Sequence, residues 1–225
     1  MGLEEAGVEF DARTGVTVDD YLRTSNPDIY AVGDCCTPFQ FTHVAGTMAG
    51  IAVENAVFGG AKRFSAQVIP WCTYTAPEVA HVGLYERDIA ARGLESDTYT
   101  VQLTHNDRAI CEGSADDGGF VKIRCRKGTD EILGATICSE HAGESISELT
   151  VAIQSRIGLG ALGRTIHPYP TVAEAIQGCG IGYNRTQWAT MDNNGRKKLE
   201  KLLNAVKPYA LGVLGGLALA ALARR

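Results

Sequence analysis

Three side chains in one short segment have groups suited to proton chemistry: His167, Tyr169 and Glu174. An imidazole titrates near neutral pH, so His167 could transfer protons, whereas a phenol with an unperturbed pKa of about 10 serves better as a hydrogen-bond donor. The alternative for His167 is a structural imidazole held by backbone hydrogen bonds. Glu174 could orient Tyr169. It could equally cap a helix that begins near Val172, because Thr171 and Glu174 have the spacing of a capping box.

A second candidate site follows the apolar run from Ile29 to Val32, which predicts a buried strand that ends at Gly33 and Asp34. A glycine lets the backbone approach a cofactor closely, and a carboxylate at the C-terminal end of a strand accepts hydrogen bonds from hydroxyl groups. The whole segment from Thr24 to Asp34 resembles the second FAD motif of the pyridine nucleotide-disulfide oxidoreductases. This resemblance implies that Gly33 and Asp34 contact a flavin, with Asp34 at its ribityl hydroxyls.

The next helix is predicted over residues 44–58, because small and apolar residues recur there at spacings of three and four before two glycines. Thr42 or His43 is expected at its N-terminal cap. In the family this helix points its N-terminus at the pyrimidine edge of the flavin. The resemblance therefore implies that Thr42, Val44 and Ala45 lie at the cofactor, the last two acting through their backbone. A helix N-terminus carries partial positive charge and unpaired N–H groups, which would stabilise a reduced flavin.

The segment from Ile166 to Glu174 is similar to the family's signature near the end of its dimerisation domain. In the disulfide reductases, a His directly before Pro-Thr pairs with a Glu there and serves the partner subunit's redox dithiol as acid-base. Tyr169 holds that His position here, which resembles mercuric reductases and not glutathione or lipoamide reductases. The resemblance implies a homodimer with FAD, NAD(P)H as the reductant, and a dithiol, disulfide or soft metal as the electron acceptor. Tyr169, Glu174 and His167 are its expected catalytic residues.

Short strands followed by helices after residue 65 predict an α+β fold with an antiparallel sheet. With the resemblance, this gives a remnant of an FAD-binding α/β domain at 1–64, a dimerisation or interface domain at 65–183, and a helical tail at 184–225. The pattern predicts strands at 68–74, 99–103, 119–126 and 131–137, a hairpin turn at 127–130, and helices at 89–92 and 144–157.

The composition excludes some classes of function. The formal net charge is −5 and lysines and arginines do not cluster as phosphate contacts require, so a nucleic-acid partner is not expected. Seven cysteines are an odd number without a secretory signal, which favours a reducing intracellular compartment over a disulfide framework. No metal site is predicted. Cys35 and Cys36 beside Asp34 could bind a soft metal ion, but packing near the cofactor is the commoner role of such residues.

Two parts of a complete flavoenzyme are missing from the pattern. No cysteine pair has the C-x-x-C or C-x4-C spacing of a flavin-linked redox disulfide. The glycines from Gly158 to Gly163 match G-x-G-x-x-G formally, but they follow a predicted helix where a dinucleotide fingerprint follows a strand. The glycines from Gly178 to Gly182 are predicted to end a helix. We therefore expect a C-terminal fragment of the oxidoreductase, the alternative being a non-catalytic dimerisation or membrane-tethering module.

The end of the sequence differs in composition from the rest. Residues 196–207 predict a basic amphipathic helix, and residues 208–223 contain no charged side chain before two closing arginines. This stretch is shorter than the roughly 20 residues of a membrane-spanning helix. It fits a membrane contact through 208–223 or a helix buried against the dimer, and both interpretations stay open.

Overall fold

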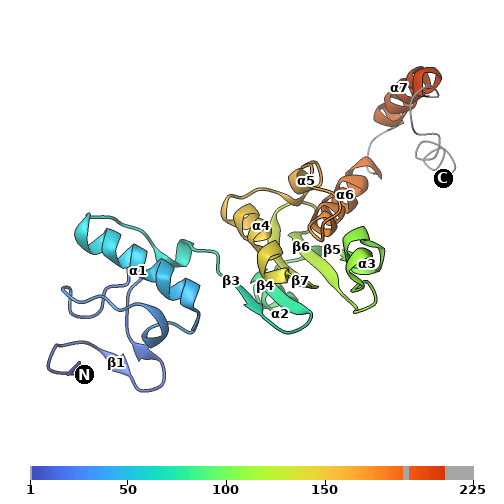
Figure 1. Cartoon of the computed structure of the whole chain (residues 1–225). Helices are drawn as coiled ribbons and strands as arrows, with labels where there is room; N and C mark the ends of the chain where they lie inside the picture. The colour runs from blue at the N-terminus through green and yellow to red at the C-terminus, as the bar shows by residue number, and fades with distance from the viewer. Residues whose placement is uncertain (1, 190–192, 211–225) are drawn as a thin grey trace.

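The computed structural model describes residues 2–189 and 193–210. Figure 1 shows an N-terminal region built around one long helix, followed by a five-stranded sheet with its covering helices. The helices are α1 (Thr42–Val57), α2 (Glu86–Ala91), α3 (Asp107–Glu112), α4 (Ala142–Gln154), α5 (Leu159–Leu162), α6 (Glu174–Ala189) and α7 (Asn193–Ala210). The strands are β1 (Phe10–Asp11), β2 (Gly15–Val16), β3 (Pro70–Thr73), β4 (Glu78–Gly83), β5 (Ser96–Gln102), β6 (Phe120–Arg126) and β7 (Ile132–Ser139). Short 3₁₀ helices occupy Gly33–Cys35, Phe64–Ala66 and Leu103–His105.

The N-terminal region is held together by α1. The helix buries one stripe, formed by Val44, Met48 and Ile51, against Leu22 and its neighbours. This stripe follows the spacing of three and four that predicted the helix. The helix begins at Thr42, however, and its N-cap is Phe41, which makes no side-chain capping hydrogen bond. The predicted cap at Thr42 or His43 is therefore wrong. The apolar packing of Phe41 against the same core places the start of the helix instead.

The apolar run before Gly33 does not form the predicted strand. Among the described residues it has a single β-bridge, between Tyr30 and Arg23, and the chain then enters the 3₁₀ helix Gly33–Cys35. A strand requires a continuous ladder of partner hydrogen bonds, and one bridge does not provide it. Ala31 is still buried, as the apolar pattern predicts.

The five-stranded sheet has the order β3-β4-β7-β6-β5, and every neighbouring pair is antiparallel. This confirms the predicted α+β class with an antiparallel sheet. Strands β6 and β7 form a hairpin, in which Gly128 adopts a φ of +73° and Thr129 donates its N–H to the Arg126 carbonyl at 2.9 Å. Strand β4 and helix α3 had no counterpart among the predicted elements.

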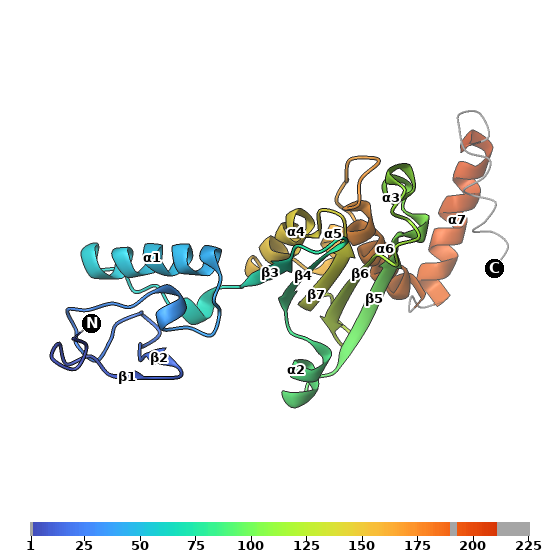
Figure 2. The same cartoon turned by 60° about the horizontal axis from the view of Figure 1, so that its bottom comes forward.

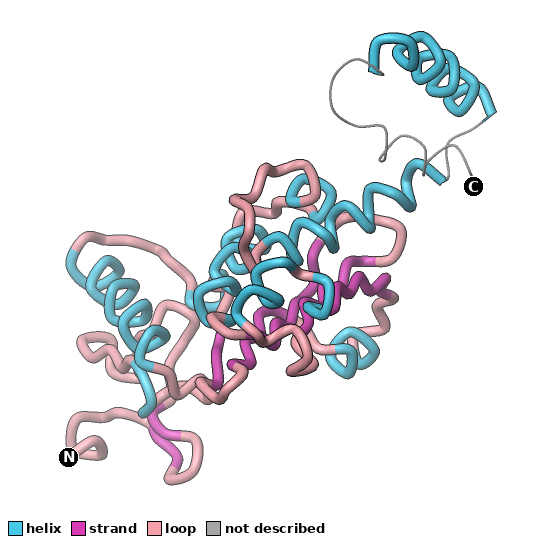
Figure 3. The backbone as a smooth tube through the Cα atoms, turned by 45° about the vertical axis from the view of Figure 1, so that its right-hand side comes forward, coloured by secondary structure: helices cyan, strands magenta, loops and turns pink. Residues whose placement is uncertain are grey.

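One face of the sheet is covered by α4 and α6, which lie side by side across it (Figures 2 and 3). Alternate residues of β6 point to these helices and are fully buried, as are Leu149 on α4 and Ile176 on α6. Burying large apolar side chains in this way is the main favourable term in folding, at about 25 cal/mol per Å² of apolar surface. The residues of the resulting core are Val121, Ile123, Cys125, Ala135, Ile137, Ile146, Leu149, Leu159, Ile176 and Cys179.

The two glycine-rich runs lie where the short helix α5 packs closely against α6. The formal G-x-G-x-x-G run spans α5, between α4 and α6, and opens no long helix after a strand. The run from Gly178 to Gly182 lies inside α6, so the prediction that it ends a helix is wrong. The physical reason is tertiary: a Cβ on Gly180 would lie 2.6 Å from the Cα of Gly163, so the two backbones touch. Glycine at these two positions lets the backbones of α5 and α6 approach each other closely.

The C-terminal helix extends further than predicted. Helix α7 contains the predicted range 196–207 and continues to Ala210. Residues 211–223 of the predicted membrane contact lie outside the described part of the chain. Within the described residues, no helix is long and apolar enough to cross a membrane.

Replacing Gly180 with alanine should lower the free energy of unfolding by about 1–3 kcal/mol, because the added Cβ would overlap the Gly163 backbone. Gly182 is the matched control in the same helix, since its Cβ would meet only Tyr99 Cδ1 at 3.8 Å. Gly182→Ala should raise stability by about 0.5–1 kcal/mol through helix propensity. Urea unfolding followed by circular dichroism measures both, and a Gly180→Ala protein as stable as Gly182→Ala would contradict the close contact.

Candidate functional site

Gly33 and Asp34 form a tight turn against the first turn of α1. Gly33 has a φ of +76°, and a Cβ built on it would lie 3.1 Å from the Ala45 Cβ. A larger residue would therefore push the turn away from the helix. The Asp34 side chain is exposed at this turn. The structure thus brings together Gly33, Asp34 and Ala45, three of the five residues predicted to bind the cofactor.

The N-terminus of α1 supplies unpaired donors beside that turn. Ala45 donates its N–H to the Phe41 carbonyl at 3.0 Å. Across the described ranges, the N–H groups of Thr42, His43 and Val44 have no hydrogen-bond acceptor, and no side chain caps the helix. Such a terminus favours an anionic or electron-rich ligand. The Val44 side chain is buried in the core, so only its backbone is available for such a contact.

Cys35, which is exposed, and Cys36, which is partly buried, make local hydrogen bonds to the backbone. Their thiols donate to the carbonyls of Val32 and Gly33, each at 3.4 Å. Burial, together with the neighbouring Cys35, raises the pKa of the Cys36 thiol to about 12, which disfavours the thiolate that a soft metal requires. In the described part of the chain, no three His, Cys, Asp or Glu side chains are grouped to hold a metal ion.

His167 has a partner at each ring nitrogen. Its Nδ1 lies 3.0 Å from the Thr165 carbonyl, and its Nε2 lies 3.0 Å from Oε1 of Glu148 on α4. The side chain is only 6% exposed. These contacts hold the loop between α5 and α6 against α4. They match the structural alternative, since a proton transfer by His167 would have to break one of them.

Tyr169 points away from the core and binds a residue that the sequence pattern did not single out. Its side chain is exposed, and its hydroxyl donates to Oδ2 of Asp107 at 2.7 Å. This hydrogen bond to a carboxylate raises the pKa of the Tyr169 phenol above its usual value. Tyr169 therefore stays protonated at neutral pH and acts as a hydrogen-bond donor. Asp107 is placed by α3, whose N-cap Asn106 accepts the Ala109 N–H at 3.1 Å.

Glu174 caps α6 and does not orient Tyr169. Its Oε2 accepts the Thr171 N–H at 3.0 Å, which is one half of a capping box. The Thr171 hydroxyl donates to the Pro168 carbonyl at 2.8 Å and, in this described part of the structure, accepts no hydrogen bond from the Glu174 N–H, which would be the reciprocal half. Of the two roles considered for Glu174, the geometry within one chain matches the capping role.

The two candidate sites do not meet within one chain. The turn at Asp34 lies beside α1 in the N-terminal region, and the segment from His167 to Glu174 joins α5 to α6 in the part of the chain that holds the five-stranded sheet, away from α1 (Figures 1 and 2). If the segment acts on a flavin bound at α1, it acts on that of a second chain. Within the segment, the partners Glu148 and Asp107 come from α4 and α3.

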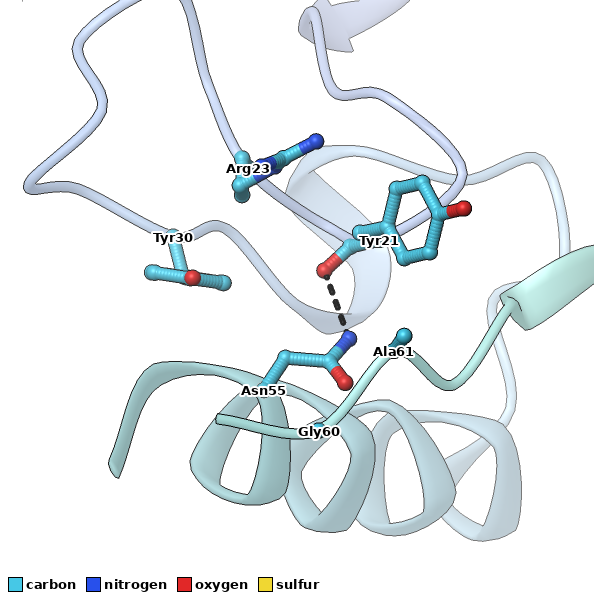
Figure 4. Close-up of a pocket in the computed structure, with 6 residues that line it drawn as sticks. All are labelled: Tyr21, Arg23, Tyr30, Asn55, Gly60 and Ala61. Carbon is cyan, nitrogen blue, oxygen red and sulfur yellow. Dashed lines mark hydrogen bonds between the residues drawn. The ribbon is translucent and has the colours of Figure 1, made fainter. Parts of the chain in front are cut away.

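A separate hollow of about 320 Å³ lies on the N-terminal region and contains none of the predicted site residues (Figure 4). It is lined by Tyr21, Arg23, Tyr30 and the end of α1 at Asn55. The Asn55 amide donates to the Tyr21 carbonyl at 3.2 Å, and Arg23 pairs with Asp19 at 2.7 Å. These polar groups are used to hold the loop to the helix.

Comparison with protein families places both regions in one group. The dimerisation domain of the pyridine nucleotide-disulphide oxidoreductases matches residues 69–178, and the pyridine nucleotide-disulphide oxidoreductase model matches residues 1–49. These two models cover the sheet with its helices and the Asp34 turn with the first half of α1. The chain belongs to the pyridine nucleotide-disulphide oxidoreductases, as the two sequence motifs predicted.

Individual relatives agree with this assignment. A mercuric reductase of Streptomyces lividans is 37% identical over 177 residues, which are 79% of this chain and 37% of that protein. A dihydrolipoyl dehydrogenase of Cupriavidus necator is 33% identical, over 83% of this chain and 39% of that protein. The crystal structure of LpdA from Mycobacterium tuberculosis aligns with a TM-score of 0.75 at 31% identity, over 81% of this chain and 39% of that one. The chain thus spans about two fifths of the length of these proteins.

Replacing Asp107 with asparagine should lower the pKa of Tyr169, because the charged acceptor that stabilises the protonated phenol is removed. Alkaline titration of the phenolate absorbance measures this, and subtracting the curve of the Tyr169→Phe protein isolates the one tyrosine. Asp116→Asn is the matched control, an exposed carboxylate on the loop after α3. If the alkaline titration curve of Tyr169 is the same in the unaltered and Asp107→Asn proteins, the hydrogen bond between Tyr169 and Asp107 is refuted.

Proposed function

We propose that this chain forms part of an FAD-dependent NAD(P)H oxidoreductase of the disulfide or mercuric reductase type. The observation that carries the proposal is the Asp34 turn packed against the uncapped N-terminus of α1. In this enzyme, residues 1–64 would form the flavin-contacting region, residues 65–183 the dimerisation domain, and residues 184–225 the tail. When bound, FAD supplies the transfer of electrons from NAD(P)H to the acceptor.

The residues present fit a flavin. Asp34 offers an exposed carboxylate that can accept from ribityl hydroxyls, and Gly33 lets the turn that holds Asp34 pack directly against the start of α1. The unpaired N–H groups at Thr42 and Val44 can donate to the pyrimidine edge, with Ala45 packed behind them. Donors and a carboxylate on adjacent elements are the arrangement that binds such a polar ring and its sugar chain.

We propose that the active unit is a homodimer, in which the segment from His167 to Glu174 faces the flavin region of the partner subunit. The separation of the two sites within one chain supports this. The segment also adjoins an apolar hollow of about 580 Å³, lined by Val151, Ile157 and Leu162 beside His167. Val151 is 58% exposed and Ile166 is 93% exposed, so a large apolar surface is uncovered in the single chain.

In the proposed dimer, the Tyr169 hydroxyl turns its single proton from Asp107 to the acceptor or to the group that binds it. Its raised pKa makes it a poor base, so it would position a thiolate or a thiolate-bound soft metal rather than take a proton from a dithiol. His167 and Glu174 would hold the loop on which Tyr169 lies. None of the seven cysteines has the spacing of a redox pair, so the redox thiols would come from residues other than these 225.

Replacing Asp34 with asparagine should weaken FAD binding by about 10-fold or more, since a hydrogen bond to a charged group contributes about 1.5–3 kcal/mol. Quenching of FAD fluorescence on titration with the purified chain measures the affinity. The chain supplies only part of the proposed flavin site, so its own affinity should be weak and FAD should separate from it on a desalting column. Asp28→Asn is the matched control, an exposed carboxylate in the same loop.

Equal affinities of the Asp34→Asn and Asp28→Asn proteins, or no FAD binding by the unaltered chain at millimolar FAD, would contradict the flavin proposal. If the chain is instead a non-catalytic dimerisation module, it should bind no FAD even at millimolar concentration.

Replacing Val151 with aspartate should weaken the dimer at least about 10-fold, because an unpaired carboxylate would be buried against the partner. Sedimentation velocity across a range of concentrations measures the monomer–dimer equilibrium. Val53→Asp on α1 is the matched control, since Val53 is 54% exposed on another helix far from the hollow. If the dimer dissociates equally in the Val151→Asp and Val53→Asp proteins, or in neither of them, the interface does not lie at the hollow beside Val151.

A further inference from the structure

Helix α7 is the least covered long helix of the described chain. It lies beyond the C-terminal end of α6 and away from the sheet (Figures 1 and 3). Every residue from Arg196 to Asn204 is exposed. A helix of this length gains little stability in water from propensity alone, so its exposed side chains indicate a partner surface.

The apolar residues of α7 lie on one stripe. Leu199, Leu202 and Leu203 have the spacing of three and four that aligns side chains along one face of a helix. They are 44%, 57% and 39% exposed, respectively. Water-exposed leucines at three neighbouring positions form a narrow apolar strip that nothing in the described structure covers.

The opposite side of α7 is strongly basic. Lys197 and Lys201 lie four residues apart, directly across the helix from Leu199, and Lys198 lies at the border of the strip. Residues 195–204 contain four basic residues and one acidic residue, a local charge of +3 in a chain whose net charge is −5. This part of the helix therefore has a net positive charge, opposite in sign to that of the whole protein.

We propose that α7 lies along the surface of a lipid bilayer rich in anionic headgroups, with its leucine strip in the acyl boundary and its lysines at the phosphates. An amphipathic helix with a basic polar face and a leucine-lined apolar face is suited to this position. The stretch that follows, residues 208–223, has no charged side chain, so the chain becomes more apolar at this point and not less.

A bilayer fits α7 better than a protein partner does. Three leucines on one strip offer far less area than the roughly 1,000 Å² that a specific protein interface buries. A lipid surface requires no shape complementarity, and its negative charge complements the lysines, each of which adds to the attraction near the surface. The exposed Trp188 at the end of α6 lies close in sequence to α7, and tryptophan is a side chain that prefers the headgroup region.

Co-sedimentation of the full chain with vesicles tests the proposal. The protein should bind vesicles of phosphatidylcholine with about 30% phosphatidylserine far more tightly than vesicles of phosphatidylcholine alone, and added salt should release it. Replacing Lys197, Lys198 and Lys201 with glutamate should lower the partition coefficient at least about 100-fold. Replacing Leu199, Leu202 and Leu203 with serine should also lower it, because the apolar contact is removed.

The matched control reverses the same number of charges on the body of the protein. Lys62, Arg87 and Lys127 have exposed side chains that each pair with a surface carboxylate, and their replacement by glutamate alters the net charge equally. This control protein should retain substantially more binding than the α7 charge variant. Equal losses in the two triple variants, equal binding to both kinds of vesicle, or no binding to either would overturn the proposal.

The fluorescence of Trp188 gives a second readout. Binding to anionic vesicles should shift the emission to shorter wavelength as the indole leaves water, and the Trp188→Phe protein should lose the shift. An unchanged spectrum on bound vesicles would overturn the proposed position of the helix. If the leucine variant instead abolishes a lipid-independent dimer in sedimentation velocity, while vesicle binding is absent, α7 covers a second copy of the chain.

Discussion

The burial of one face of the five-stranded sheet under α4 and α6 is the constraint on which the positions of the other elements depend. Alternate side chains of β6 and β7 fill the space between the layers, with Leu149 and Ile176 fully buried. Because both helices are fixed on the sheet, the loop that joins α5 to α6 has little freedom. Its contacts are made to helices that the core has already placed, and this gives Tyr169 a defined position although the side chain is exposed.

A second consequence concerns the glycines at the α5–α6 contact. Gly163 and Gly180 allow the two backbones to touch, which brings the start of α6 and its capping residue Glu174 next to the loop. Glycine weakens a helix interior by about 0.5–1 kcal/mol, so its use inside α6 is a local cost offset by closer tertiary packing. The same principle operates at Gly33, where the missing side chain lets the Asp34 turn approach α1.

The candidate site is a set of short, separate pieces placed by different parts of the fold. The Asp34 turn and the α1 N-terminus offer a carboxylate and unpaired donors, whereas the loop before α6 offers a phenol that remains protonated. Neither piece contains a grouped metal site in the described residues, and no two of the seven cysteines have the spacing of a redox pair. Under the proposed function, a flavin, redox thiols and a second subunit would complete the site, and the residues of this chain would orient them.

The sequence by itself determined the family, the antiparallel α+β class, the helix α1, the hairpin of β6 and β7, and the basic amphipathic character of α7. These follow from local periodicity, turn residues and motif spacing, which act over a few residues. Only the tertiary structure decided that Glu148 binds His167, that Asp107 binds Tyr169, and that Glu174 caps α6. The first two pairs join residues 19 and 62 positions apart, so packing of α4 and α3 had to bring them together before either side chain acquired its role.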